Sequence, residues 1–377
     1  MTTKRTLLAL ALLAVVGITA FAVLRSPTGD EIRVGVLVPL TGGAASYGEN
    51  ARKGAELALQ EFSAKHPELR IVLSVEDSRG EAAVGLSAAN KLVDLDRVVA
   101  IVGCVTSGVT LAVAPQANEW KIPLVSPGGS SPNLTTAGDY VFRTWPSDVF
   151  EADAMARYIG SRGISRLAIL RINNEYGAAM EAAIRQKLEQ AATTPISVVA
   201  AETFEQGARE MRTQVLKINQ ATPQAIYFVG FPEAVVVFAR GYAEAGLAMP
   251  VLATSGFEDP QVPRDAGRTL DGTVYTKPQS NSPAVEAFRA AYQRSYGQDP
   301  GVVSDTAYDA TMLILNAIAA SAADGQPVNG EAVRGALLAV RDYPGASGML
   351  SFDENGDVIK PIVLFTLRDG KYEPFVE

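Results

Sequence analysis

One stretch of the chain, residues 98–132, most constrains the fold, because it contains two apolar runs that each end in small polar residues. The β-branched run 98–102 predicts a buried strand, and the run 122–125 predicts a second one. A helical pattern over 109–120 lies between them. Strands joined through a helix form parallel sheets, and the carboxyl ends of parallel strands open onto one crevice. The sequence therefore predicts a ligand site at the two loops that follow these strands.

The residue types in these two loops favour a small carboxylate as the ligand, rather than a phosphate. The first loop, GCVTSG at 103–108, leads into a helix whose free N–H groups and positive dipole end attract an anion. Ser107 stands where an N-cap or first-turn hydroxyl would add another donor. The second loop, SPGGSS at 126–131, has the same small polar character. The alternative is that both are ordinary turns, since glycine and serine are common in all turns.

Strand and helix patterns alternate along most of the chain, which is typical of α/β folds. The alternation runs once through residues 32–146 and restarts near residue 148, and no low-complexity linker separates the two halves. We therefore expect two lobes joined by several short crossings, rather than two domains on one flexible tether. The expected strands are 32–38, 70–75, 98–102, 122–125, 167–170, 197–201, 225–231, 251–253, 272–276, 349–352 and 362–367, and the expected helices include 50–63, 82–95, 109–120, 148–159, 208–219, 283–296 and 303–321.

The N-terminus has the pattern of an export signal. Lys4 and Arg5 precede an uninterrupted apolar run over 7–24, and Ala20-Phe21-Ala22 fits an A-x-A cleavage site. Residues 1–22 are therefore expected to be a signal peptide. The alternative is an uncleaved membrane anchor ending at residue 24, because a run of about 18 apolar residues is at the threshold for a membrane span. Either interpretation places the rest of the chain outside the cytoplasm.

Composition argues against several classes of function. Lysine and arginine number 33 against 41 aspartates and glutamates, so the net charge is −8 and no basic stripe offers a nucleic-acid footprint. Cys104 is the only cysteine and His66 the only histidine, so neither an internal disulfide nor a Cys/His metal site can form. A Ser-His-Asp triad would have to use His66, which lies at an expected helix end. We therefore expect a binding protein with no catalytic residues, no cofactor and no metal.

Several motifs together resemble the type I periplasmic binding proteins of the leucine/isoleucine/valine-binding group, which serve branched-chain amino acid ABC transporters. They occur in the family's order and cover nearly the whole exported chain. The resemblance implies two Rossmann-like lobes with parallel sheets, joined by three hinge crossings, that close around a ligand. It places lobe one at 30–146 and 280–346, and lobe two at 147–279 and 347–377. The motifs are IRVGVLVPLTGGAASYGENARKGAELAL, AIVGCVTSGVTLAVAP, IPLVSPGGSSPNLT, YVFRTWPSD, LAILRINNEYGAAM, AIYFVGFPEA and MLSFDENGDV.

The resemblance also implies roles for residues of the two loops. Ser107 matches the serine that binds the ligand's α-carboxylate through its hydroxyl and backbone N–H. Ser130 matches a threonine that contacts both the carboxylate and the ammonium. Gly128 matches the residue whose carbonyl accepts a hydrogen bond from the ammonium. Hydroxyls and oriented N–H groups suit a carboxylate, which agrees with these roles.

Three aromatic residues match the family's apolar walls. Tyr47 stands where an aromatic residue of the first loop covers the ligand, and Tyr176 and Phe231 match aromatics that the second lobe brings down on closing. Aromatic walls suit an apolar ligand side chain. The alternative is that all three pack in a core, although Tyr47 and Tyr176 lie beside glycine in expected polar loops.

The chain departs from the family at the acid that binds the ammonium. That glutamate aligns near Ser255, so Glu258 or Asp305 is expected to replace it; otherwise the ligand has no free ammonium. The family disulfide is also absent, because Cys104 has no partner.

Taken together, we expect a monomeric, extracytoplasmic solute-binding protein that delivers an amino acid or a related carboxylate to an ABC transporter permease. One alternative is a ligand-sensing module of the same fold that feeds a signalling receptor. The other alternative is a serine hydrolase, but this chain has no G-x-S-x-G nucleophile elbow.

Overall fold

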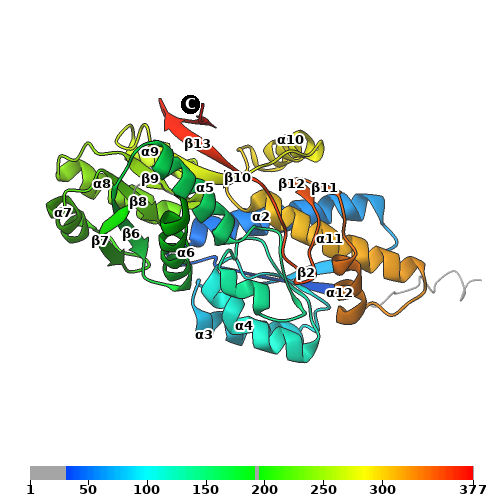
Figure 1. The fold of residues 1–377 in the computed structure, drawn as a ribbon. Helices are drawn as coiled ribbons and strands as arrows, with labels where there is room; N and C mark the ends of the chain where they lie inside the picture. Colours follow the sequence, from blue (N-terminus) through cyan, green and yellow to red (C-terminus); the bar gives the residue numbers. More distant parts are fainter. Residues whose placement is uncertain (1–30, 192–194, 377) are drawn as a thin grey trace, which may run out of the picture.

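The computed structural model describes residues 31–191 and 195–376, which fold into two lobes (Figure 1). Lobe one is built on a five-stranded sheet with the order β2-β1-β3-β4-β5, in which every neighbouring pair is parallel. Its strands are β1 (Ile32–Val38), β2 (Ile71–Asp77), β3 (Ile101–Gly103), β4 (Leu124–Ser126) and β5 (Val141–Arg143).

Lobe two is built on a seven-stranded sheet with the order β14-β13-β10-β9-β8-β6-β7. The five parallel strands β7-β6-β8-β9-β10 repeat the strand order of lobe one, and β13 and β14 add an antiparallel edge. The strands are β6 (Arg166–Ile172), β7 (Ser197–Phe204), β8 (Ala225–Val229), β9 (Val251–Ala253), β10 (Val274–Pro278), β13 (Ile362–Arg368) and β14 (Lys371–Pro374). The α/β class and the parallel-dominated lobes predicted from the sequence are confirmed.

Helices cover both sheets. Lobe one has α2 (Ala45–Lys65), α3 (Ala82–Asp94), α4 (Ser107–Trp120), α10 (Ala284–Tyr296), α11 (Ser304–Ala323), α12 (Gly330–Leu338), the 3₁₀ helix η1 (Pro132–Thr136) and the hairpin of β11 (Tyr343–Gly345) and β12 (Gly348–Leu350). Lobe two has α5 (Asp148–Ser161), α6 (Glu175–Ala191), α7 (Arg212–Gln220), α8 (Pro232–Glu244), α9 (Gln261–Ala266) and the 3₁₀ helix η2 (Ser255–Phe257).

Strand sequences follow their position in the sheets. All five residues of β8, AIYFV, are buried, as expected for a central strand that helices cover on both faces. The edge strand β7 consists mostly of partly buried and exposed residues instead. In lobe one, α2 and α11 approach so closely that a Cβ atom at Gly54 would lie 2.1 Å from the carbonyl oxygen of Ser304. Glycine is therefore required at that contact.

Three helix starts differ from the sequence prediction in a way that affects the site. Helix α2 begins at Ala45 and α6 at Glu175, so Tyr47 and Tyr176 lie in first helical turns rather than in loops. Strand β8 ends at Val229, and Phe231 caps the N-terminus of α8 rather than ending the strand. In each case the helix starts immediately after a short loop, so its first turn faces the same sheet edge as the loop.

The chain passes between the lobes three times, after β5, after β10 and before β13 (Figure 1). The β11–β12 hairpin runs past the predicted boundary at 346/347, and Lys360 donates to the carbonyl (3.0 Å) and hydroxyl (2.6 Å) of Ser347. Asp357 forms an ion pair with Arg143 of lobe one. We therefore propose that the third crossing lies near 358–361, and we keep the other predicted boundaries as proposals.

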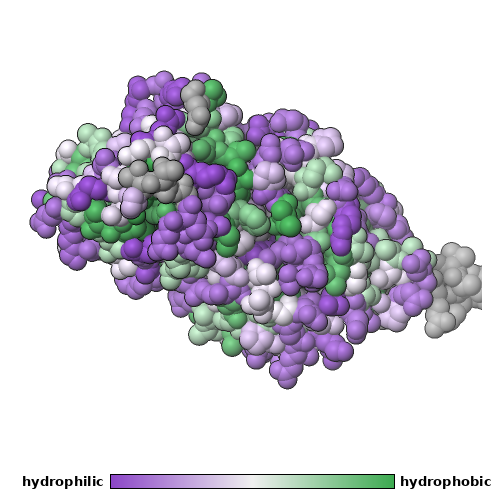
Figure 2. Space-filling view, in the orientation of Figure 1, coloured by the Kyte–Doolittle hydropathy of each residue, from purple (hydrophilic) through white to green (hydrophobic). Residues whose placement is uncertain are grey.

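The surface on the side shown in Figure 2 is mostly hydrophilic, with hydrophobic residues gathered mainly in the middle, where chain segments pass between the lobes. Within the described part of the chain, no helix combines the length and apolar character that crossing a membrane requires. The expected signal peptide, with its alternative as an anchor, lies in residues 1–30 and so outside the described residues.

Candidate functional site

A small, partly open cavity lies between the lobes. Most of its lining residues directly follow the carboxyl ends of strands, on both sheets, as the topology predicts for a ligand site. The lining residues are Tyr47, Val105, Thr106, Ser107, Gly128, Ser130, Trp145, Tyr176, Phe231, Ser255, Gly256 and Val303.

Ser107 is the first residue of α4, and its side chain joins the two loops of lobe one. Its Oγ accepts hydrogen bonds from the backbone N–H of Ser130 (3.2 Å) and of Ser131 (3.1 Å). Because these two bonds use the acceptor positions of the hydroxyl, its own proton is left as a donor. The first-turn N–H groups of α4 point the same way and have no partner inside the helix. This corner of the cavity is therefore built to hold an anion.

Thr106 adds a second hydroxyl to this corner. It is 6% exposed, and its Oγ1 forms no hydrogen bond with any described residue. Buried hydroxyls normally have a partner, so Thr106 is an additional candidate for contact with a ligand.

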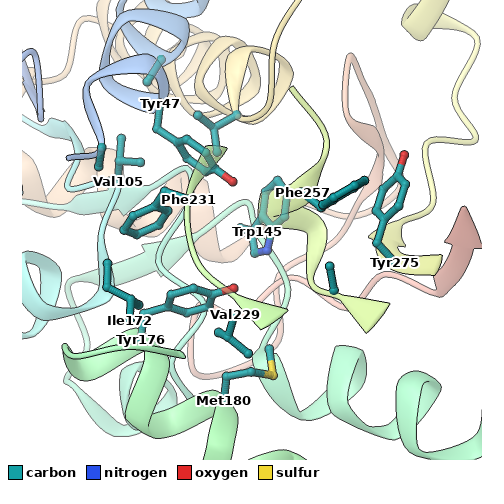
Figure 3. Packing of buried hydrophobic residues seen from close by; sticks show 14 of the residues in the cluster. Tyr47, Val105, Trp145, Ile172, Tyr176, Met180, Val229, Phe231, Phe257 and Tyr275 are labelled. Atoms are coloured by element: carbon teal, nitrogen blue, oxygen red, sulfur yellow. The ribbon is translucent and has the colours of Figure 1, made fainter. Parts of the chain in front are cut away.

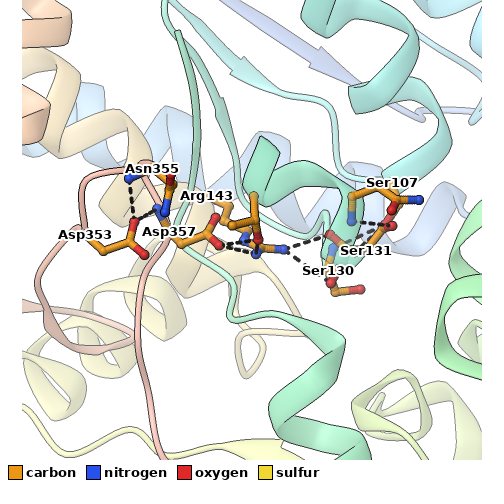
Figure 4. A network of polar contacts seen from close by, with 9 residues as sticks. Ser107, Ser130, Ser131, Arg143, Asp353, Asn355 and Asp357 are labelled. Atoms are coloured by element: carbon orange, nitrogen blue, oxygen red, sulfur yellow. Dashed lines mark hydrogen bonds and ion pairs between the residues drawn. The ribbon is translucent and has the colours of Figure 1, made fainter. Parts of the chain in front are cut away.

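A buried arginine fixes the second loop (Figure 4). Arg143 is 1% exposed, and its guanidinium donates to the carbonyl oxygens of Ser130 (3.3 Å) and Ser131 (3.0 Å), to Thr135 (2.8 Å) and to the carboxylate of Asp357. Four donor contacts to three chain segments hold this loop in one position.

Gly128 lies where the loops after β3 and β4 come closest. A Cβ atom there would lie 2.7 Å from the carbonyl oxygen of Val105 and 3.2 Å from the side chain of Val303. No larger residue fits, so glycine keeps its backbone carbonyl at the cavity.

Aromatic rings form the opposite wall, as Figure 3 shows. Phe231 contacts Tyr47 edge-to-face with ring centroids 5.3 Å apart and stacks on Tyr176 at 5.7 Å. The Tyr176 hydroxyl donates to Thr254 at 2.8 Å. Burial raises the pKa of both Tyr47 and Tyr176 well above the ordinary value, so both hydroxyls stay neutral. The wall therefore offers apolar surface to a ligand.

The matches to known proteins fit this geometry. Residues 31–371 match the family described as Periplasmic binding protein. The chain belongs to this family. The resemblance predicted from the sequence motifs is thereby confirmed. The family groups solute-binding proteins rather than enzymes, and it indicates an extracytoplasmic location.

Relatives of this periplasmic binding protein align over nearly their full length. A Leu/Ile/Val-binding protein homolog of Brucella melitensis is 28% identical over 370 residues, which cover 96% of this chain and 98% of that protein. A leucine-, isoleucine-, valine-, threonine- and alanine-binding protein of Pseudomonas aeruginosa is 26% identical, with 92% of each chain covered.

Solved structures with the same architecture include a leucine binding protein of Thermotoga maritima, with a TM-score of 0.82 at 26% identity, covering 92% of this chain and 98% of that one. The branched-chain amino acid transporter substrate binding protein of Streptococcus pneumoniae, solved in complex with isoleucine, has a TM-score of 0.82 at 25% identity, with 91% and 98% covered.

Two carboxylates of this periplasmic binding protein reach across from lobe two to lobe one. Glu175 accepts from the side chains of Asn133 (2.9 Å) and Ser131 (3.3 Å), and Glu233 accepts from the backbone N–H of Ser46 (3.0 Å). Both glutamates lie in first helical turns, where the helix dipole favours a negative charge. These contacts exist only while the lobes are together.

The structure brings six of the eight predicted site residues to the cavity and places two elsewhere. Glu258 accepts from Tyr275 (2.9 Å) and Lys277 (2.5 Å), away from the lining. Asp305, also outside the lining, accepts from the backbone N–H of Thr306 at 2.8 Å. Glu258 has its own cation, and Asp305 lies at the N-terminus of α11, where the dipole favours it. Their contact with a ligand stays a prediction.

Six lining residues were not predicted as contacts. Thr106 lies beside Ser107, and Trp145 lies in the YVFRTWPSD motif, so both could have been predicted from the residues next to them in the sequence. Ser255 was noted only as the position where the family's glutamate is missing. Nothing in the local sequence marks Val105, Val303 or Gly256. No group of His, Cys, Asp and Glu side chains arranged to bind a metal ion occurs among the described residues.

Proposed function

We propose that this protein is the solute-binding component of an ABC importer and binds a small ligand with a carboxylate, of the branched-chain amino acid type. Ser107 and Ser130 would bind the carboxylate and Gly128 would offer a carbonyl. Tyr47, Tyr176 and Phe231 would enclose the apolar part.

The observation that carries the proposal is the makeup of the cavity wall. One corner, on lobe one, combines a helix N-terminus with hydroxyls, while the opposite wall is aromatic. A carboxylate and a short apolar side chain need these two environments. The relatives above are named for binding leucine, isoleucine and valine, which have the same two parts.

The contacts between the two lobes support closure around a ligand. Tyr47 of lobe one meets Phe231 of lobe two, and Glu175 and Glu233 join the lobes at two more points. A ligand touching both walls would add contacts that the separated lobes lack, and so would favour the closed state.

The proposal also covers the partner protein, the location and the oligomeric state. The transporter relatives favour a permease as the partner over a signalling receptor. A cleaved signal at 1–22, a periplasmic location, a monomeric state and the absence of catalysis complete the proposal.

Two measurements test it. We expect mass spectrometry of the purified protein after gentle unfolding to release an amino acid or another small carboxylate. We expect solution scattering to show a smaller radius of gyration on saturation with L-leucine than after the ligand has been removed by unfolding and refolding. Released material without a carboxylate, together with no binding of L-leucine, L-isoleucine, L-valine or their deaminated acids, would contradict the proposal.

A further inference from the structure

Loops of the two lobes meet on the side of the molecule that lies farthest from the crossings. In lobe one they follow β1 and β2, and in lobe two the loop follows β7. Strands β2 and β7 are the outer strands of their sheets, at the opposite end from β5, β10 and β13, where the chain passes between the lobes. In a hinge rotation the displacement grows with distance from the axis. Contacts between these loops therefore change most when the lobes part.

Asp77, at the end of β2, holds the two loops of lobe one together. Its carboxylate accepts from the Thr41 hydroxyl (2.6 Å) in the loop after β1 and from the backbone N–H of Arg79 (2.8 Å) in the turn after β2. Each loop contains glycine, and we call the two segments, 41–43 and 78–80, the glycine socket. Because one carboxylate bonds to both segments, the socket keeps its shape within lobe one.

The turn at 205–208 of lobe two enters the glycine socket. A Cβ atom at Gly43 would lie 2.8 Å from Cγ of Gln206 and 2.9 Å from the backbone nitrogen of Gly207. A Cβ atom at Gly80 would lie 2.8 Å from Nε2 of Gln206. Packed atoms do not come this close, so the turn fits only because neither position of the socket carries a side chain.

The two glycines of the socket differ in what a side chain would disturb. Gly80 has a φ of 71°, so any other residue would also strain the backbone of its own turn. Gly43 has no positive φ, and the three atoms nearest to a Cβ there all belong to Gln206 and Gly207 of lobe two. An alanine at residue 43 would therefore act on the contact between the lobes and leave the socket itself unstrained.

We propose that the glycine socket and the 205–208 turn form a clasp that holds the lobes closed and so controls how long a bound ligand stays in the cavity. This inference rests on the proposed function, because it concerns closure around the same ligand. None of the clasp residues lines the cavity, so docking of a ligand on lobe one does not require them.

The test measures the distance between the lobes in the native protein, Gly43→Ala and a matched control, Gly335→Ala. A Cβ atom at Gly335, an exposed position of α12, would meet nothing within 4 Å. Spin labels on Ser87→Cys of α3 and Asn219→Cys of α7, both exposed, report the distance, while the native Cys104 is buried. Each protein is measured as purified, after unfolding and refolding to remove its ligand, and with L-leucine added.

We expect the control to match the native protein. Overpacking a close contact is unfavourable, so Gly43→Ala should lower the ratio of closed to open molecules about five- to a hundredfold. L-leucine should dissociate faster by a similar factor and associate at the native rate, which stopped-flow kinetics measures. Gln206→Gly alone should lower the ratio less. Added to Gly43→Ala, it removes Cγ and leaves two adjacent glycines in the turn, so part of the closed population should return. Melting curves show which variants are folded.

The outcomes separate the clasp from the proposed function. Native distances in both Gly43→Ala and Gln206→Gly would overturn the clasp and leave ligand binding standing. Equal loss of the closed state in Gly335→Ala, or no recovery in the double variant, would also overturn it. So would a native protein whose labels keep one distance under all three conditions. Failure to bind any small carboxylate would overturn the proposed function alone, because the distances of the protein as purified do not depend on which ligand it carries.

Discussion

Lobe one and lobe two reach the cavity in the same way, through segments at the carboxyl ends of parallel strands in the same spatial order, yet they build different walls. Lobe one contributes hydroxyls, a helix N-terminus and tightly packed glycine loops. Lobe two contributes the rings of Tyr176 and Phe231 together with Ser255 and Gly256. The shared topology therefore fixes where a ligand binds, while the loops decide which part of the ligand each lobe meets.

The two walls also differ in how they are held. In lobe one, Ser107 and Arg143 bond to the second loop within the lobe itself, so this corner keeps its shape when the lobes separate. In lobe two, Phe231 packs against Tyr47 of the other lobe, so the aromatic enclosure is complete only in the closed state. We infer that the ligand first docks on lobe one and that lobe two then closes over it.

Breaking the lobe-one brace should give the largest effect. Asp357→Ala leaves the guanidinium of Arg143 buried without its carboxylate, which costs about 3–5 kcal/mol in the free energy of unfolding. Urea unfolding of the ligand-free protein measures this. Asp265→Ala, which breaks the exposed pair with Arg264, should cost far less, because exposed ion pairs contribute little to stability. Equal effects of the two substitutions would show that Arg143 does not brace the loop.

Removing the aromatic enclosure should weaken binding without destabilising lobe one. Phe231→Ala should lower the affinity for L-leucine about tenfold, mainly through faster dissociation, because docking on lobe one is retained. Phe231→Leu keeps most of the apolar volume and should lose less. Stopped-flow kinetics separates the two rates. A loss confined to the association rate would mean that lobe two takes part in the first encounter.

Removing one contact between the lobes should have a smaller effect. Glu175→Ala deletes the bonds from Ser131 and Asn133, so the affinity for L-leucine should fall two- to fivefold, corresponding to at most about 1 kcal/mol. Glu189→Ala, at an exposed position of the same helix, should change nothing. If the melting temperature of the ligand-free protein falls while the affinity stays the same, Glu175 acts within the fold rather than in closure.

Sequence patterns were sufficient for the architecture but only for part of the site. The strands β1 and β9 have the predicted limits, because apolar runs bounded by turns define them locally. Helix α12 and strand β14 were not anticipated, since GEAVRGALL and KYEP are short and mixed in character. Ser107 could be predicted because its loop and helix start are adjacent in the sequence.

The contacts of buried acids could not be predicted from sequence alone. Glu151 looks like part of the ordinary acidic first turn of a helix, and only the fold shows that Ser255, 104 residues away, bonds to it. Glu258 and Asp305 were reasonable candidates because each lies near a segment that reaches the cavity. Their side chains instead bond to Tyr275 and Lys277 and to the backbone N–H of Thr306, which only the three-dimensional structure could show.

The most direct test of the account is calorimetric titration of L-leucine into the native protein, Ser107→Ala and Ser107→Thr. Ser107→Ala removes the hydroxyl that would donate to the carboxylate and leaves the Ser130 and Ser131 N–H groups without their acceptor. Hydrogen bonds to charged groups contribute about 1.5–3 kcal/mol, so the affinity should fall roughly ten- to a hundredfold, while Ser107→Thr should retain most of it. A Ser107→Ala protein with a lower melting temperature but the native affinity for L-leucine would contradict the claim that lobe one binds the ligand's carboxylate.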